Sequence, residues 1–184
     1  KKIIVIALVA ILSVVSVFAQ AAAETQSSTT KIVVGATPEP HAALLSLVVD
    51  DLAAQGITLE IKEFTDYVTP NDAVEYGEID ANYFQHIPYL ESFNTEHGYH
   101  LVNAGGIHVE PIALYSSKYS SLSDIPNGAV IAIPNDPTNE GRALLLLEAA
   151  GLIKLSADAG LEATPVNIAE NPNGFKFTEV EQKK

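Results

Sequence analysis

The chain has 184 residues, of which 47% are hydrophobic, and its 10 Lys and Arg against 23 Asp and Glu give a formal net charge of −13. This composition predicts a folded protein of one domain or two small lobes. The negative charge excludes the clustered basic residues that nucleic-acid binding needs, and it disfavours docking on an anionic membrane surface. The sequence contains no cysteine, which excludes disulfides, thiol catalysis and Cys-type zinc sites.

The first 23 residues are typical of a secretory signal peptide. Lys1 and Lys2 precede an apolar run over residues 3–18, and small residues follow at 19–23. An uncleaved membrane anchor is the alternative, although the run is slightly short for a spanning helix of ~20 residues. Residues 24–30 are small and polar, and they are predicted to form a linker.

Residues 31–113 are predicted to form a first α/β lobe. Apolar spacing at Leu44, Leu47, Val48 and Leu52 indicates a helix that Gly56 closes. Strands are predicted at 31–37, 57–64 and 78–85, helices at 41–56, 70–77 and 87–98, and extended segments at 99–105 and 107–117. In the helix at 87–98, one face is expected to carry Ile87, Leu90 and Phe93. Strands that alternate with helices predict a largely parallel sheet.

A parallel sheet binds ligands beyond the carboxyl ends of its strands, where the following loops converge. This rule selects the turn at 37–41, the loop at 65–67, and the side chains of Tyr83, Phe84 and His86. These groups are aromatic and polar, which suits a small, partly apolar ligand. The alternative is that Tyr83 and Phe84 are aromatic residues of the core or of the sheet edge.

Residues 114–184 are predicted to form a second α/β lobe after a polar link at 121–129. Asp136 is expected to cap a long helix in which Pro137 is the first residue and which Gly151 ends. Leu144 to Leu147 make this helix apolar all round, so it should be buried on several sides. Further strands are predicted at 129–134 and 175–180, and a short helix near 166–170.

Arg142 is the only arginine of the sequence, and it lies in the first turns of this helix on the same face as Thr138 and Asn139. Backbone N–H groups and the helix dipole favour an anion at the amino end, and a guanidinium binds a carboxylate with two hydrogen bonds. With Asn135 these residues predict a receptor for an amino-acid-like carboxylate. The alternative is that Asp136 only caps the helix and that Arg142 pairs with Glu140, Glu148 or another surface acid.

No pattern typical of an enzyme is present in the sequence. It contains no G-x-S-x-G elbow, phosphate-binding P-loop or G-x-G-x-x-G, and no nucleophile beside an oriented base. We therefore predict no catalysis, no cofactor and no metal. One metal-binding alternative stays open, because His108 and Glu110 share one side of an extended segment and His86 could join them.

Four blocks of the sequence closely resemble the NlpA-type methionine-binding lipoproteins of ABC importers: KIVVGATPEPHA, IKEFTDYVTPNDAVEYGEIDANYFQHIPYL, GIHVEPIALYS and IAIPNDPTNEGRALLLLEAAGLIKL. The resemblance implies a two-lobed periplasmic-binding-protein fold, similar to type II, with the ligand between the lobes. It implies L- or D-methionine, or a close derivative such as a short methionine peptide, as ligand. It also implies a permease with its ATPase as partner.

The resemblance also assigns roles to individual residues. The thioether side of the pocket would be lined by Tyr67, Tyr83, Phe84 and His86. His108 and Glu110 would lie near the hinge on the crossover between lobes. The charged end of the amino acid would be held by Asn135, Thr138, Asn139 and Arg142.

The chain departs from the family pattern in two places. The family has a lipobox cysteine after its signal sequence and this chain has none, which favours a soluble protein in the periplasm or at the outer face of the cell membrane. Family members also continue past the segment at 175–180, so we expect the second lobe and the return to the first lobe to be incomplete at Lys184.

The leading hypothesis is an extracytoplasmic substrate-binding protein that delivers methionine to an importer. The alternative is an extracytoplasmic metal-binding or adhesin-type module without amino-acid transport.

Overall fold

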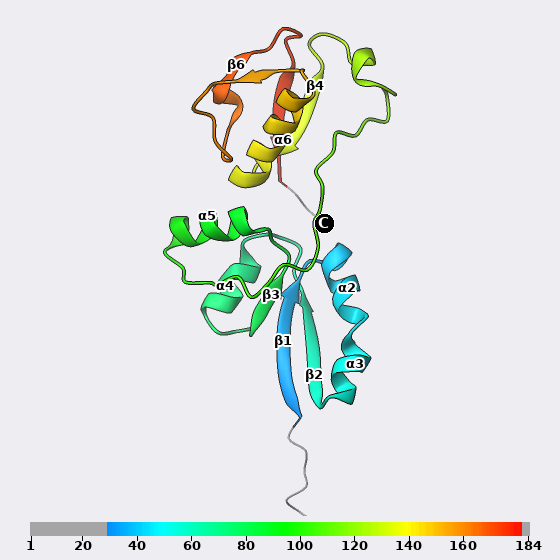
Figure 1. Cartoon of the computed structure of the whole chain (residues 1–184), viewed down its shortest axis with the longest axis vertical. Helices are drawn as coiled ribbons and strands as arrows, with labels where there is room; N and C mark the ends of the chain where they lie inside the picture. The colour runs from blue at the N-terminus through cyan, green and yellow to red at the C-terminus, as the bar shows by residue number, and fades with distance from the viewer. Residues whose placement is uncertain (1–28, 182–184) are drawn as a thin grey trace, which may run out of the picture.

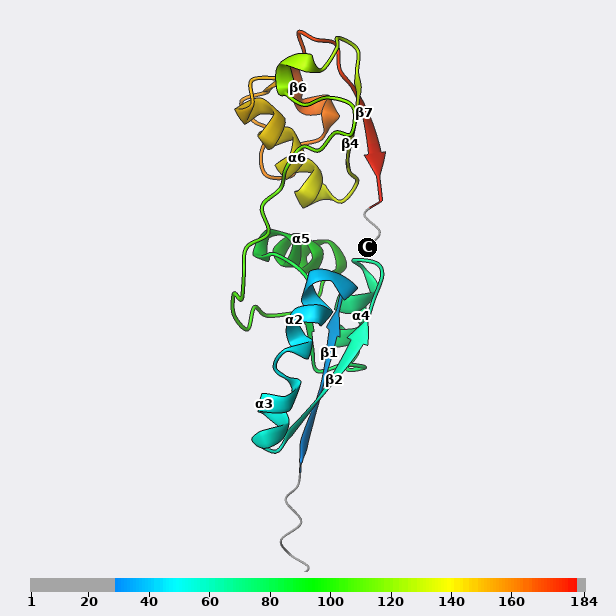
Figure 2. The same cartoon turned by 90° about the vertical axis from the view of Figure 1, so that its right-hand side faces the viewer.

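The computed structural model describes residues 29–181, in which two α/β lobes follow one another along the long axis (Figures 1 and 2). The predicted signal peptide and nearly all of the predicted linker lie outside these residues. The segment at 99–121 runs from one lobe to the other, and the predicted boundary after residue 113 falls within it. Within residues 29–181, no helix is both long enough and apolar enough to cross a membrane.

The first lobe is built on a three-stranded parallel sheet in the order β2-β1-β3. Its strands are β1 (Thr30–Ala36), β2 (Ile57–Glu63) and β3 (Ala81–Tyr83). The helical turn η1 (Pro38–Ala42) and the helices α2 (Ala43–Ser46) and α3 (Val49–Ala54) lie on the β2 side, and α4 (Thr69–Glu75) and α5 (Ile87–His97) on the β3 side (Figure 1). The most buried part of β1 is its carboxyl end, where Ala36 and the following Thr37 are fully buried.

The prediction of one continuous helix at 41–56 is wrong, because residues 47 and 48 interrupt it. The structure ends α2 at Ser46 and starts α3 at Val49, and Val48 has the non-helical φ and ψ of −106° and 0°. Leu47 is 74% exposed, and Leu44 and Val48 are exposed as well. Helical spacing reports an apolar face, and it does not tell whether another element covers that face. The predicted stop at Gly56 is confirmed by its φ of 79°.

Helix α5 is confirmed, but its buried face differs from the prediction. Ile87 is 50% exposed, whereas Tyr89, Leu90 and Phe93 are buried. Tyr89 is buried because its ring packs with Phe84 and Phe93 in an aromatic cluster. The helix ends at Gly98, which has the left-handed φ of 70° that glycine adopts without steric cost.

A buried amide network holds the turn between β3 and α5. Asn71 is fully buried and exchanges hydrogen bonds of 2.7 and 3.1 Å with Gln85, while Asn82 donates to Asn71 at 2.8 Å. Strand β3 itself has three residues and not the predicted eight, and Gln85 beyond its end pairs through its side chain with Asn71 of α4. The network thereby positions the turn that carries Phe84 and His86.

The second lobe packs the predicted long helix against two strands. Helix α6 (Pro137–Ala149) covers the parallel pair β4 (Val130–Pro134) and β7 (Lys176–Val180). The smaller elements are η2 (Leu122–Asp124), β5 (Lys154–Leu155), η3 (Pro165–Asn167) and β6 (Ile168–Glu170). Leu144 and Leu147 are at most 2% exposed, whereas Leu145 and Leu146 are only partly buried, so the expected burial is confirmed for one side of the helix.

The short helix predicted near 166–170 is wrong. Residues 165–167 form one tight helical turn, which is stabilised because Thr164 N–H and Oγ1 both donate to Asn167 Oδ1. Ile168 then pairs with Leu155 in an antiparallel strand, as suits a β-branched residue.

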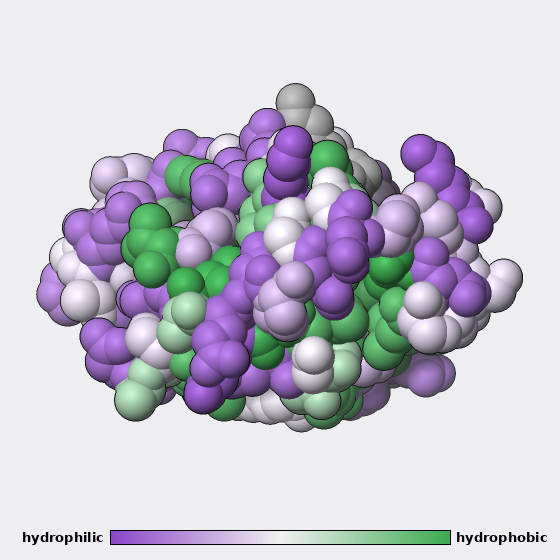
Figure 3. Space-filling model, turned by 90° about the horizontal axis from the view of Figure 1, so that it is seen from above, coloured by the Kyte–Doolittle hydropathy of each residue, from purple (hydrophilic) through white to green (hydrophobic). Residues whose placement is uncertain are grey.

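Seen from the end of the molecule that the second lobe forms, the surface mixes hydrophilic side chains with smaller hydrophobic areas (Figure 3).

Gly141 allows α6 to approach the loop at 161–163. A Cβ at this position would lie 1.9 Å from the carbonyl oxygen of Leu161 and 3.0 Å from the backbone nitrogen of Ala163.

We expect Gly141→Ala to lower the free energy of unfolding by about 3 kcal/mol, because the backbone of the loop cannot move aside as a side chain would. Urea unfolding measures this difference. The control is Gly160→Ala, where a Cβ would meet nothing within 4 Å; equal losses in both variants would contradict the packing argument.

Candidate functional site

The parallel strands β1, β2 and β3 of the first lobe and β4 and β7 of the second direct their carboxyl ends at the space between the lobes (Figures 1 and 2). The residues that follow β1, β2, β3 and β4 therefore meet there, as the rule for parallel sheets requires. From the first lobe come the turn at 37–41, the loop at 64–68 and the turn at 84–86, and from the second lobe the turn at 135–138.

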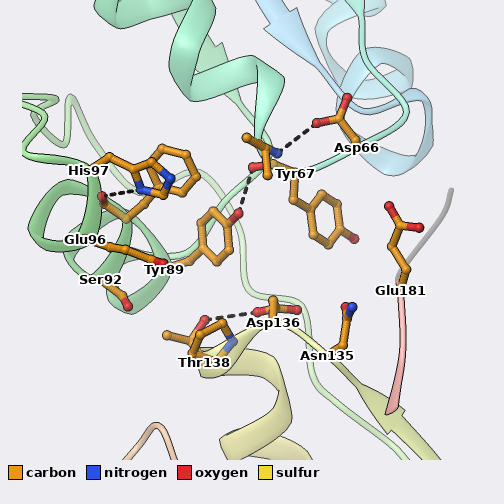
Figure 4. A pocket seen from close by; sticks show the side chains of 13 residues that line it. Asp66, Tyr67, Tyr89, Ser92, Glu96, His97, Asn135, Asp136, Thr138 and Glu181 are labelled. Carbon is orange, nitrogen blue, oxygen red and sulfur yellow. Dashed lines mark hydrogen bonds between the residues drawn. The ribbon is translucent and has the colours of Figure 1, made fainter.

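A cavity of about 340 Å³ lies at this junction (Figure 4). Its volume suits a small ligand, since ligand pockets begin at roughly 300 Å³. The first lobe contributes the loop residues 66–68 and one face of α5, and the second lobe contributes the residues 135–138 at the start of α6. Glu181, which follows β7, completes the lining. The cavity is thus shared by elements far apart in the sequence.

Two tyrosines form the first-lobe wall of the cavity. The Tyr89 hydroxyl donates to the carbonyl oxygen of Tyr67 at 2.8 Å, which holds the loop against α5 (Figure 4). Burial and then the carboxylate of Asp136 raise the pKa of both phenols, and Glu110 adds to the rise at Tyr67. Both side chains therefore stay neutral at physiological pH. The Tyr67 ring also lies 5.9 Å from that of Phe84, so this wall is aromatic.

The loop that carries Tyr67 is fixed by Asp66. Its carboxylate accepts hydrogen bonds from the N–H and hydroxyl of Thr69 at 2.7 and 2.8 Å and from the N–H of Val68 at 2.9 Å. Burial raises the pKa of Asp66, but these hydrogen bonds to the ionised form outweigh burial and hold the pKa below its ordinary value. Asp66 consequently stays charged at the rim of the cavity.

The opposite wall is the amino end of α6. Asp136 has extended backbone angles and accepts a hydrogen bond from the N–H of Asn139 at 3.0 Å, so the predicted cap is confirmed. The same carboxylate accepts from the Asn139 side-chain amide at 3.0 and 3.1 Å and from the Thr138 hydroxyl at 3.3 Å. The carboxylate of Asp136 therefore accepts hydrogen bonds from the Thr138 and Asn139 donors at this end of the helix.

A chain of hydrogen bonds crosses from α5 to α6. The N–H of Tyr89 donates to His86 Nδ1 at 3.0 Å, so the proton of the neutral imidazole lies on Nε2. His86 Nε2 then donates to Asn139 Oδ1 at 3.1 Å, and Arg142 Nη1 donates to the same oxygen at 2.8 Å. These contacts join the first lobe to the arginine of the second.

Arg142 donates to two neutral oxygens. Its second partner is the carbonyl oxygen of Glu110, at 2.8 Å from Nη2. Within residues 29–181 it forms no ion pair with Glu140 or Glu148, so this part of the surface-pair alternative is wrong. Glu148 instead accepts from the N–H of Leu155 at 2.8 Å. The guanidinium is held in place without a carboxylate partner from either glutamate.

The structure divides the predicted site residues into three adjacent groups. Tyr67, Asn135 and Thr138 line the cavity, with Phe84 buried behind Tyr67. His86, Asn139 and Arg142 form the hydrogen-bonded chain beside the cavity, although none of the three belongs to its lining. Tyr83, His108 and Glu110 lie together at the segment between the lobes. Their use by a ligand stays a prediction.

The proposed joining of His86 to His108 and Glu110 is wrong. His86 is engaged by Asn139 and Tyr89, and the imidazole that lies beside Glu110 belongs to His41. Sequence reasoning placed His41 only within a turn. It also missed Tyr89, although Tyr89 follows His86 by three residues and so shares its helix face. For Glu181 no sequence signal pointed to the cavity.

A family model for the NlpA lipoproteins matches residues 32–184. The membrane lipoprotein TpN32 of Treponema pallidum is 50% identical over 157 residues, which are 85% of this chain and 59% of that protein. The D-methionine-binding lipoprotein MetQ of Escherichia coli K12 is 49% identical over 126 residues, 68% of this chain and 46% of MetQ. The chain thus spans about half the length of these relatives.

A solved structure extends the similarity to the fold. The nutrient binding protein of Burkholderia cenocepacia bound to methionine superposes with a TM-score of 0.77 at 46% identity, over 82% of this chain and 64% of that one. This likeness confirms the predicted two-lobed α/β binding-protein fold over the part that the chain covers.

Glu140 on α6 is buried without compensation. It is 5% exposed, and its Oε1 has no hydrogen-bond partner in the part of the chain that the structure describes. Burial and then the carboxylates of Glu179 and Asp136 raise its pKa above the ordinary 4.5. A raised pKa means that the folded state favours the protonated acid over the ionised one. The protonated Glu140 side chain therefore contributes to the free energy of unfolding, fully below about pH 4.5, and this contribution is lost as the pH rises through the raised pKa.

We expect Glu140→Gln to raise the free energy of unfolding by about 1 kcal/mol at neutral pH, since it removes an uncompensated buried charge. The gain should vanish near pH 4, where the wild-type acid is protonated. Urea unfolding at the two pH values measures it. The exposed Glu162 provides the control, and Glu162→Gln should change stability little at either pH. A gain that does not depend on pH would refute the assignment.

Proposed function

Because the chain belongs to the NlpA lipoprotein family, we propose that it binds methionine, in the L or D form, or a close derivative, between its two lobes. In this proposal it is a binding component of an ABC importer and not an enzyme. It works outside the cytoplasmic membrane and passes its ligand to the permease, which the ATPase drives.

The observation that best supports this proposal is that the only arginine of the sequence is held beside an aromatic cavity between the lobes. Its guanidinium donates to Asn139 Oδ1 and to the carbonyl oxygen of Glu110, both neutral acceptors. A ligand carboxylate is the stronger acceptor, because hydrogen bonds to ionised groups are about twice as strong as neutral ones. Arg142 therefore provides the anchor for the carboxylate, with Asn139 and His86 as its support.

The aromatic wall suits the other end of methionine. The rings of Tyr67, Tyr89 and Phe84 lie within 6.3 Å of one another, centroid to centroid. A thioether gains about 0.3–1.5 kcal/mol from contact with an aromatic ring, and its apolar chain gains from leaving water. The wall thus favours a ligand with a flexible apolar side chain that contains sulfur.

The carboxylates around the cavity suit the ammonium group. Asp66, Asp136 and Glu181 are among its lining residues, and Asp136 is fixed as the helix cap. An ammonium ion buried between lobes needs such acceptors, because an unpaired buried charge is costly. A cationic group and carboxylates beside the same cavity are the arrangement that an amino acid zwitterion requires.

Binding between lobes that the segment at 99–121 connects also fits delivery to a permease. Lobes of this kind close around a ligand by bending at the connecting segment, so the bound and free proteins present different surfaces. The permease would recognise the closed form. The partner itself follows from the resemblance of the sequence blocks to lipoproteins of ABC importers.

We expect the full-length gene product to bind methionine at one site. Isothermal titration calorimetry measures this stoichiometry and the affinity. Arg142→Ala should weaken binding by about 2–5 kcal/mol, because it leaves the ligand carboxylate without its charged partner. Methionine at about 100 times its Kd should also stabilise the wild type by about 2.7 kcal/mol.

The control is Lys118→Ala, which removes an exposed cation of the segment between the lobes and should bind methionine as the wild type does. Absence of both heat and stabilisation in the wild type would refute methionine binding. Unchanged affinity in Arg142→Ala would refute the role of the arginine.

A further inference from the structure

Three potential metal ligands converge at the segment between the lobes, next to the cavity. His41 comes from η1 after the first strand, and His108 and Glu110 come from the connecting segment. One ligand atom from each residue lies within 4.8 Å of the other two. His41 is buried, so the cluster has a rigid base in the first lobe and an open side toward solvent.

Both imidazoles are oriented by hydroxyl groups behind them. His41 Nδ1 lies 2.6 Å from Thr37 Oγ1, and His108 Nδ1 lies 2.6 Å from the hydroxyl of Tyr83. These contacts leave each Nε2 directed at one atom, Glu110 Oε1, at 3.2 Å from His41 and 2.9 Å from His108. A partner on the second ring nitrogen is the usual support of a metal-binding histidine, since it fixes ring orientation and tautomer.

The hydroxyl partners permit two states of the same cluster. A hydroxyl both donates and accepts, so Thr37 and Tyr83 can pair with Nδ1 in either tautomer. When Nε2 carries the proton, both rings donate to Glu110. When Nδ1 carries it, the lone pairs of the two Nε2 atoms and the carboxylate face one another, and only a cation between them makes that arrangement favourable. The cluster is therefore ready for a cation without rebuilding its surroundings.

The spacing fits a small tetrahedral ion. Ligand bonds of about 2.0–2.2 Å place tetrahedral neighbours about 3.3–3.6 Å apart, which is roughly 0.1–0.7 Å beyond the observed 2.9 and 3.2 Å. The side chain of Glu110 is 43% exposed and can retreat by that distance. Two imidazoles and one carboxylate favour zinc-like ions over magnesium or calcium, which prefer oxygen ligands.

We propose that His41 Nε2, His108 Nε2 and Glu110 form a binding site for a zinc-class divalent cation, with water as the fourth ligand. The cation ties the connecting segment to the first lobe beside the methionine cavity. Arg142 donates to the carbonyl oxygen of Glu110, so a cation that fixes the connecting segment also fixes the acceptor of the arginine. The formal net charge of −13 favours the approach of any cation.

Zinc chloride alone, titrated by calorimetry into the protein as its gene encodes it, tests the site. We expect one equivalent in the wild type, loss of that equivalent in Glu110→Gln and in His108→Gln, and about 10–100-fold weaker binding in Tyr83→Phe, which keeps all three ligands. X-ray absorption at the zinc edge should show two imidazole ligands. No methionine is present, so the result is independent of the proposed methionine site.

The matched control is His100→Gln. His100 is an exposed histidine 3.4 Å from the carboxylate of Glu75, outside the cluster, and its variant should bind zinc as the wild type does. Circular dichroism verifies that each variant is folded. The proposal is overturned if the wild type binds no zinc, if Glu110→Gln and His108→Gln both retain the equivalent, or if His100→Gln loses it.

Discussion

The organisation of the protein depends on the parallel pairing of strands in both lobes. Parallel strands end at the same edge, and the β2-β1-β3 sheet and the β4-β7 pair each direct that edge at the space between the lobes. Loops that follow different strands are thereby brought together there, although 50 or more residues separate some of them in the chain. This one geometric constraint places the loop that carries Tyr67, the amino end of α6 and His41 around the same space.

Within that space, Asn139 connects the groups that have to act together. Its amide donates to the cap residue Asp136, and its oxygen accepts from both His86 and Arg142. Nη1 and Nη2 of Arg142 therefore each donate to an acceptor of defined direction, which limits the rotamers of the arginine. A guanidinium that is already positioned loses less conformational entropy when it meets a carboxylate. The neutral partners of Arg142 are the physical basis for proposing an amino-acid ligand.

Local signals in the sequence predicted local structure well. Asp136 followed by Pro137 marked the start of α6, and Gly98 marked the end of α5, because caps depend on neighbouring residues alone. At Ile168 the prediction failed because a distant partner decided the outcome: the residue forms a strand because Leu155 lies beside it. At Val48 it failed because the apolar spacing appeared continuous although the helix is interrupted there and this apolar face stays exposed. Periodicity contains no information about which element covers a face or pairs with an edge.

By itself, the sequence determined the α/β class, the candidate residues at strand ends, and the family, because these follow from periodicity, caps and the matched blocks. The tertiary structure alone decided which candidates meet. It put Tyr89 in the cavity wall, set His86 against Asn139, and placed His41 rather than His86 beside Glu110. These contacts join residues from different strands and lobes, and the distance between such side chains is set by packing of the sheets, which no local sequence pattern encodes.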